Sequence, residues 1–231
     1  MPMFYGMDPT WILLIPAILL SLYAQAKVNS TYKRYARVQS RRGIPAYRMA
    51  QEMLYMNGLG HIRVEQVAGS LTDHYDPSKK VLRLSQATYG SSSVAALGVA
   101  AHECGHALQD AEQYGPLRLR GALVPVANIG SSASWILILL GVFIGLGDLV
   151  SLGIVLFAAV VLFQLVTLPV EFNASSRALA TLEGSGFLDA EEMPMAKKVL
   201  SAAALTYVAA TLTALLQLLR LVLIFGGRDR R

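Results

Sequence analysis

Four long apolar segments alternate with polar stretches along the chain. They cover residues 11–26, 122–146, 149–170 and 199–225. The last three reach the roughly 20 residues that a helix needs to cross the hydrocarbon core of a bilayer. The first segment is shorter, but Trp11, Tyr23 and Lys27 are suitable interfacial anchors for a short span. The pattern therefore predicts four membrane helices.

The stretch 27–121 carries the periodicities of a folded domain. Apolar residues at helical spacing follow Pro45 and stop before Asn57, which predicts a helix. The segment HIRVEQV alternates like a strand, and LTDHYDPSKKVLRLS predicts a hairpin with its turn at Asp76-Pro77-Ser78 and its second strand over 81–85. The segment ATYGSSS interrupts this pattern, and one of its serines can cap the apolar helix that follows.

Composition agrees with a membrane protein. Hydrophobic residues make up 54% of the chain and charged residues only 15%, unlike a soluble domain. The net charge of +5 comes mostly from a basic stretch after the first apolar segment, which suits anionic lipid headgroups. No stacking aromatic residues are interleaved with these basic residues, so we expect the lipid bilayer and no nucleic acid as a partner.

Charge also predicts the orientation in the cell membrane. Seven basic residues and no acidic residue lie between Lys27 and Arg48, so this flank should stay in the cytoplasm. Counting spans from there places 27–121 and 170–198 inside and the turn at Asp148 outside. The N-terminus would face outward, and no cleavable signal peptide is expected, because the first ten residues contain no Lys or Arg.

The last apolar segment is open to two interpretations. If it spans the membrane, Arg228, Arg230 and Arg231 lie outside, against the charge rule, and Arg220 is embedded near one end. A re-entrant or interfacial final helix would avoid both consequences. The side of the C-terminus stays open at this point.

The helix that follows the three serines carries candidate chemistry. His102 and His106 are four residues apart and so lie on one helical face, where two imidazoles can bind one ion. Burying two histidines for packing alone would be costly, because each ring nitrogen needs a partner. Glu103 is poorly placed as a ligand, but it can take a proton from an activated water and pass it to a departing amine. This is the HExxH pattern of zinc peptidases.

A catalytic zinc has three protein ligands and one open position. One subclass of zinc peptidases has a glycine and a third histidine at the positions of Gln109 and Glu112, so that subclass is excluded. We expect Glu171 as the third ligand, because two spans return the chain to the side of the two histidines. Pro169 is expected to open the helix that carries it. Glu112 and Asp76 are weaker alternatives.

The chain resembles the YugP-type membrane zinc metallopeptidases, a family related to the HtpX-like and CAAX prenyl-protease gluzincins. The resemblance covers nearly the whole chain and rests on LTDHYDP, VLRLS, AAHECGHALQ and LPVEFNASSRAL, in that order. It implies a zinc endopeptidase with one Zn²⁺ per chain. The implied ligands are His102, His106 and Glu171, with Glu103 as the general base.

The resemblance implies further roles around the cleft. The strand 81–85 would border it, and an extended substrate would add alongside by main-chain hydrogen bonds. The substrate-binding residues would then be Val81, Leu82, Arg83 and Leu84. His74 would polarise the scissile carbonyl. The family pattern usually reads Glu-Phe-Asp, whereas this chain has Asn173, which can accept a hydrogen bond from a zinc-ligating histidine but supplies no charge.

These predictions describe a mainly α, multi-pass helical membrane protein with a small α+β zincin-like catalytic domain, formed by a short sheet and the HExxH helix. The expected segments are an anchor helix (1–26), a cytoplasmic zincin-like domain (27–121), a transmembrane hairpin (122–170), a helix with the third zinc ligand (171–198), and a C-terminal membrane helix with a basic tail (199–231). The expected substrates are membrane-associated or unfolded polypeptides.

Two other functions compete with this one. An intramembrane protease would hold the His102 helix inside the bilayer, but the apolar run 94–101 is too short to reach the bilayer centre. That class also expects an aspartate ligand in a later span, and 122–146 and 149–170 contain no acidic residue. A metal-binding scaffold without catalysis would not need Glu103 between the two histidines.

Overall fold

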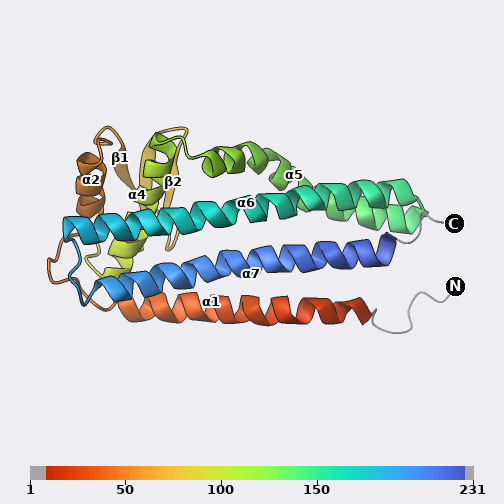
Figure 1. Cartoon of the computed structure of the whole chain (residues 1–231), viewed down its shortest axis with the longest axis horizontal. Helices are drawn as coiled ribbons and strands as arrows, with labels where there is room; N and C mark the ends of the chain where they lie inside the picture. Colours follow the sequence, from red (N-terminus) through yellow and green to blue (C-terminus); the bar gives the residue numbers. More distant parts are fainter. Residues whose placement is uncertain (1–8, 227–231) are drawn as a thin grey trace. The chain divides into compact units, whose positions relative to one another are not determined.

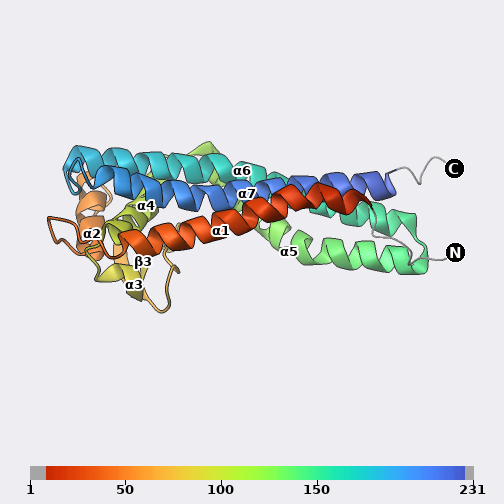
Figure 2. The ribbon, with the colours of Figure 1, turned by 90° about the horizontal axis from the view of Figure 1, so that it is seen from below.

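The computed structural model describes residues 9–226, which are mainly helical with one small sheet. These residues form two compact units. The span unit comprises 9–23, 119–168 and 206–226, and the site unit comprises Ala24–Arg118 and Pro169–Leu205. Figures 1 and 2 draw the ribbon from two sides. The predicted basic tail, with Arg228, Arg230 and Arg231, lies outside the described residues.

Four helices of the described chain are long and apolar enough to cross a membrane, and each contains most or all of one of the four apolar segments. They are α1 (Ile15–Tyr35, preceded by the 3₁₀ helix Pro9–Leu14), α5 (Gly115–Ile144), α6 (Gly147–Ser185) and α7 (Met193–Phe225). In the span unit, Ile138, Phe157 and Leu221 join α5, α6 and α7 in one apolar cluster. Other large apolar side chains of these helices are exposed, as lipid contact requires.

The small sheet of the site unit follows helix α2 (Ala46–Met56), whose bounds agree with the prediction. Asn57 ends this helix, and its side-chain amide donates to the carbonyl of Met53 at 2.8 Å. The strands are β1 (Arg63–Val67), β2 (His74–Asp76) and β3 (Val81–Ser85). The predicted hairpin is present as the antiparallel pair β2–β3, and β1 joins β3 in parallel, so that β3 is the middle strand.

Helix α4 (Val94–Ala111) forms the centre of the site unit. The Ser93 hydroxyl caps it by accepting a hydrogen bond from the amide of Ala96 at 3.3 Å, as expected of one of the three serines. Its apolar side chains, such as Leu97, pack with Met53 of α2 and Leu82 of β3 in the main core. Burying a side chain of this size contributes roughly 1.5–3 kcal/mol. A short helix, α3 (Gln86–Tyr89), lies where the sequence indicated only a break.

The prediction that Pro169 opens a helix is wrong. Helix α6 (Gly147–Ser185) is continuous and contains Pro169 in its interior. A proline cannot donate the helical hydrogen bond, but helices of membrane proteins tolerate this where neighbouring groups satisfy the freed carbonyl. Glu171 therefore lies on the same helix as the third span. Within 171–198, expected as one helix, α6 ends at Ser185 and α7 begins at Met193.

Candidate metal centre

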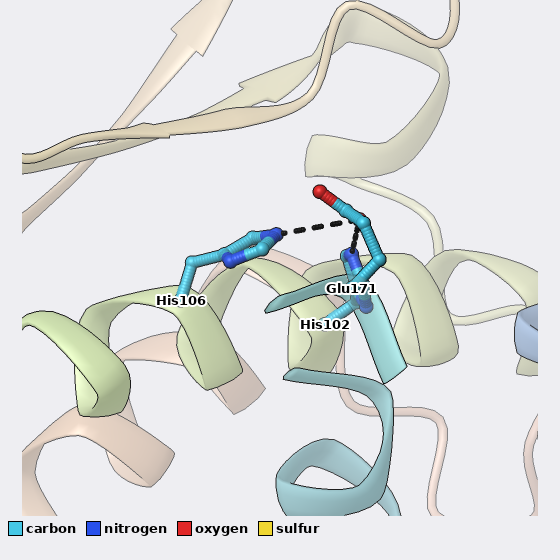
Figure 3. A group of neighbouring side chains, drawn as sticks. All are labelled: His102, His106 and Glu171. Atoms are coloured by element: carbon cyan, nitrogen blue, oxygen red, sulfur yellow. Dashed lines mark hydrogen bonds and ion pairs between the residues drawn. The ribbon is translucent and has the colours of Figure 1, made fainter. Parts of the chain in front are cut away.

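Three side chains from two helices of the site unit point toward one another. His102 and His106 lie one turn apart on α4, and Glu171 comes from α6 (Figure 3). The Glu171 Oε2 atom is 3.2 Å from His102 Nε2 and 3.7 Å from His106 Nε2. The two rings meet edge to face, with centroids 4.7 Å apart. The chain thus gathers two imidazole nitrogens and one carboxylate oxygen at a single point.

The donor set fits a zinc ion. One ligand atom of each residue lies within 4.8 Å of the other two. In a tetrahedral site with bonds of about 2.0–2.1 Å, the ligand atoms are about 3.4 Å apart, close to the separations seen here. The carboxylate of Glu171 is only 2% exposed. A buried carboxylate between two imidazoles requires positive charge nearby, and a divalent cation would supply it.

The outer nitrogens of both rings are held by neighbouring side chains. His106 Nδ1 lies 3.0 Å from Gln109 Oε1, and His102 Nδ1 lies 3.2 Å from Ser175 Oγ. With a proton on Nδ1, each ring donates outward and keeps the lone pair of Nε2 directed at the shared point. Sequence reasoning missed both partners. Their signal was spacing, because Gln109 is three residues after His106 and Ser175 four after Glu171.

Gln109 connects the two helices. Its side chain is fully buried, and its amide nitrogen donates to the carbonyl of Val170 at 2.8 Å and to Asn173 Oδ1 at 2.9 Å. The Asn173 oxygen also accepts from Arg177 Nε at 2.7 Å. Asn173 thus supports His106 through Gln109 and makes no direct histidine contact among the described residues. Acceptance of hydrogen bonds, which Asn provides as well as Asp, is what this position requires.

Glu103 lies on α4 beside the two histidines but outside the group of three. It is 8% exposed, and its Oε2 accepts a hydrogen bond from the backbone amide of Tyr75 at 3.0 Å. This bond comes from β2, on the side of the strand that is not paired with β3. The Tyr75 hydroxyl donates to Asp110 at 2.6 Å, which ties β2 to the C-terminal part of α4. The carboxylate of Glu103 is therefore held in place by the strand.

The pKa of His106 is affected by the carboxylates of Glu171 and Glu103 nearby. Burial lowers the pKa of His106, but the hydrogen bond to Glu171 and the charges of Glu171 and Glu103 outweigh burial and leave the pKa above its ordinary value. The neighbouring carboxylates thus favour positive charge at this ring, as they would favour a bound cation. Because a metal binds the neutral imidazole, protons and metal compete for this residue.

The two alternative third ligands are engaged elsewhere. Glu112 forms a two-pronged ion pair with Arg177 at 2.6 and 2.7 Å, which also lowers the pKa of Glu112. Asp76 caps its own turn by accepting from the amides of Ser78 and Lys79, and these bonds, with the Lys79 amide first, lower its pKa. Neither carboxylate joins the two histidines.

The structure contradicts the predicted substrate contact along β3. This strand is paired with β1 on one side and β2 on the other, so it has no free edge. Val81, Leu82 and Leu84 are at most 1% exposed and belong to the interior, and Arg83 pairs with Asp76 at 3.0 Å. Sequence periodicity identified the strand but not its place in the sheet.

His74 lies at the start of β2 with an exposed side chain. Its Nδ1 is 2.8 Å from the carbonyl oxygen of Thr72, and its Nε2 is 3.3 Å from Arg83 Nη1. These contacts do not link it to the group of His102, His106 and Glu171. Its predicted role in polarising the scissile carbonyl stays a prediction.

Comparisons with known proteins agree with this site. Residues 10–226 match the model of a family described as "Putative neutral zinc metallopeptidase". The chain is 50% identical over 218 residues to the "Putative membrane protease YugP" of Bacillus subtilis (strain 168), covering 94% of this chain and 97% of that protein. No solved structure matches the chain. With four helices suited to a membrane and a zinc-compatible centre, the chain belongs to this family of neutral zinc metallopeptidases.

Proposed function

We propose that this protein is a membrane-anchored endopeptidase of the gluzincin type, with one zinc ion held by His102, His106 and Glu171. The observation that carries the proposal is the convergence of the three ligand atoms within 4.8 Å. Two ligands come from one helical turn and the third from a later helix, as the HExxH-plus-glutamate arrangement requires. A zinc ion bound there supplies Lewis acidity, which polarises a carbonyl and makes water acidic enough to attack near neutral pH.

Glu103 is the general base in this proposal. Its carboxylate takes a proton from the attacking water as the water oxygen bonds to the scissile carbonyl carbon. It then delivers that proton to the amine nitrogen as the C–N bond breaks. The hydrogen bond from the Tyr75 amide supports this role, because it fixes one carboxylate oxygen and leaves the other for the proton.

The outer edge of β2 is the better place for an extended substrate. The Tyr75 amide points away from β3 and toward Glu103, so a peptide running along this edge would pass over the proposed base. Main-chain pairing of this kind depends little on side chains, which suits unfolded or membrane-associated polypeptides as substrates. We further propose that the site unit faces the cytoplasm, on the basis of the basic stretch Lys27–Arg48.

The test separates metal binding from catalysis. Purified Glu103→Gln should keep about one zinc per chain, while cleavage of a fluorogenic unfolded polypeptide falls by about 10²–10⁴-fold, because the base is lost but no ligand is. Zinc is measured by elemental mass spectrometry. Full cleavage by this variant would refute the assigned base. Loss of cleavage with zinc retained would exclude a non-catalytic scaffold.

A matched pair of carboxylates tests the ligand set in the same assays. Glu171→Gln should lose zinc and activity together. Glu112→Gln removes the same charge from a residue paired with Arg177, and it should leave zinc content unchanged. If the Glu112 variant loses the metal and the Glu171 variant keeps it, the assignment of the third ligand is wrong.

A further inference from the structure

A groove of about 680 Å³ lies between α1 and α7 within the site unit. The two helices lie side by side in both views of the ribbon (Figures 1 and 2). None of the three candidate metal ligands lines this groove. It is therefore a second feature of the site unit, separate from the candidate metal centre.

The groove is formed by one face of each helix. From α1 come Lys27, Ser30, Thr31 and Arg34, which have the spacing of residues on one helical face. From α7, the lining residues have the same periodicity. They are Pro194, Lys197, Lys198, Ser201, Ala202 and Leu205. Both helices thus present cations and hydroxyl groups to the groove, and α7 adds the small and apolar side chains of Ala202 and Leu205.

The charge of the groove is uncompensated within residues 9–226. Lys27, Arg34, Lys197 and Lys198 line it, and no acidic residue does. None of the four takes part in a salt bridge of the described chain. Four cations around one hollow repel each other, so an anion that entered would lower the electrostatic energy.

The acidic residues just before α7 are already occupied. Asp189 and Glu191 form ion pairs with Arg41, and Glu192 accepts hydrogen bonds from the amides of Arg41 and Asp189. The first amides of α7 are also bonded, since those of Met193 and Ala196 donate to carbonyls of the preceding turn. An anion in the groove would therefore meet side-chain cations and hydroxyl groups, and the helix N-terminus would contribute only its dipole.

The groove lies where apolar sequence gives way to charge. Lys27 directly follows the apolar run 11–26, and Lys198 directly precedes the run 199–225. From Lys27 to Arg34 the helix rises about 10 Å, enough to pass through one headgroup layer of a bilayer, which is roughly 5–8 Å thick. The Arg34 guanidinium lies 5.5 Å from the centre of the Tyr35 ring, a contact that restrains the arginine at the outer end.

We propose that this groove binds the headgroup of an anionic phospholipid. The phosphate is held by Arg34, Lys197 and Lys198, with the hydroxyl of Ser201 as an additional donor, since the Ser30 hydroxyl already donates to the carbonyl of Lys27. The apolar residues toward Leu205 accommodate the start of the acyl chains. A free phosphate shares the anionic chemistry, but it has no apolar part that could contact this end of the groove, and it does not require a position beside two membrane spans.

The experiment measures lipid binding to the full chain in detergent by native mass spectrometry. The probes are dioctanoyl phosphatidylglycerol, dioctanoyl phosphatidylcholine and inorganic phosphate. The groove variant carries Arg34→Gln, Lys197→Gln and Lys198→Gln. The control variant carries Lys33→Gln, Arg37→Gln and Arg42→Gln, which removes the same charge from exposed residues outside the groove. Zinc content and elution profile check that both variants remain folded.

We expect phosphatidylglycerol to bind wild type and control alike, and the groove variant about tenfold or more weakly. Equal weakening in both variants would show diffuse attraction and no site. Equal binding of phosphatidylcholine would show that charge is not recognised, and full competition by inorganic phosphate at equal concentration would show a free-phosphate site. Each of these three results overturns the proposal. None of them bears on the zinc site, whose test has its own readouts.

Discussion

Gln109 is the residue at which three contacts of the metal centre meet. It receives a hydrogen bond from His106 and donates to Val170 and Asn173, so it sets the ring of one ligand against the helix of another. In the sequence analysis, Gln109 served only to exclude the subclass of zinc peptidases that has a glycine at this position. Its role follows from burial, because a fully buried amide must satisfy both its donors and its acceptor.

Replacement of Gln109 should weaken zinc binding. In Gln109→Leu, His106 Nδ1 and the Val170 carbonyl lose their partner, and such losses around a metal typically cost 10–100-fold in affinity. The measurement is competition for zinc with a chelator of known affinity. Asn173→Asp is the control, since it keeps the oxygen that accepts from Gln109, and its affinity should stay within about threefold. An unchanged affinity in Gln109→Leu would argue against the described support of His106.

At the scale of elements, the close approach of α4 and α6 depends on Gly105. A Cβ atom placed there would collide with the carbonyl oxygen of Ala174 and lie 3.1 Å from its Cα atom. No rotamer can relieve contacts with backbone atoms. The glycine inside the HExxH motif thus permits the helix that carries two ligands to reach the helix that carries the third.

Gly105→Ala should therefore reduce zinc affinity, although alanine favours the helix by roughly 1 kcal/mol. The α6 backbone must move away, and Glu171 moves with it. Gly98→Ala on the same helix is the matched control, because its new methyl group would lie 3.8 Å from the Cβ of Ala196, an ordinary contact. Chelator competition and thermal unfolding should show a loss for the first variant and none for the second. Equal behaviour of the two would contradict the close packing at Gly105.

The elements themselves were largely predictable, and their neighbours were not. Helical and strand periodicity gave α2, the β2–β3 hairpin and the serine cap of α4, since each depends on residues close in sequence. The position of β3 in the middle of the sheet depends on its pairing with β1, which is separated from β3 in the sequence by β2. No local pattern indicated this pairing. Likewise, the histidine spacing predicted two ligands, whereas the contact of Ser175 with His102 and the bonds of Gln109 to Val170 and Asn173 depend on α4 and α6 being brought together.

For the whole molecule, the proposed orientation can be tested with single cysteines. The native Cys104 is buried, so introduced cysteines report on exposure without interference. Ser78→Cys on the β2–β3 turn should resist an impermeant maleimide in intact cells and react after lysis. Asp148→Cys, at an exposed position in the first turn of α6, should react in intact cells. The reverse pattern would place the peptidase site outside the cell.

Pro169 gives the third span a further property. Because it cannot donate to the carbonyl of Leu165, bending of α6 costs least at this point, two residues before Glu171. Membrane helices change tilt when bilayer thickness changes. Such a change would be taken up at the proline, while Gln109 keeps the following turn attached to α4. Bending of α6 at Pro169 would therefore change the tilt of the preceding span and leave Glu171 in place beside the two histidines of α4.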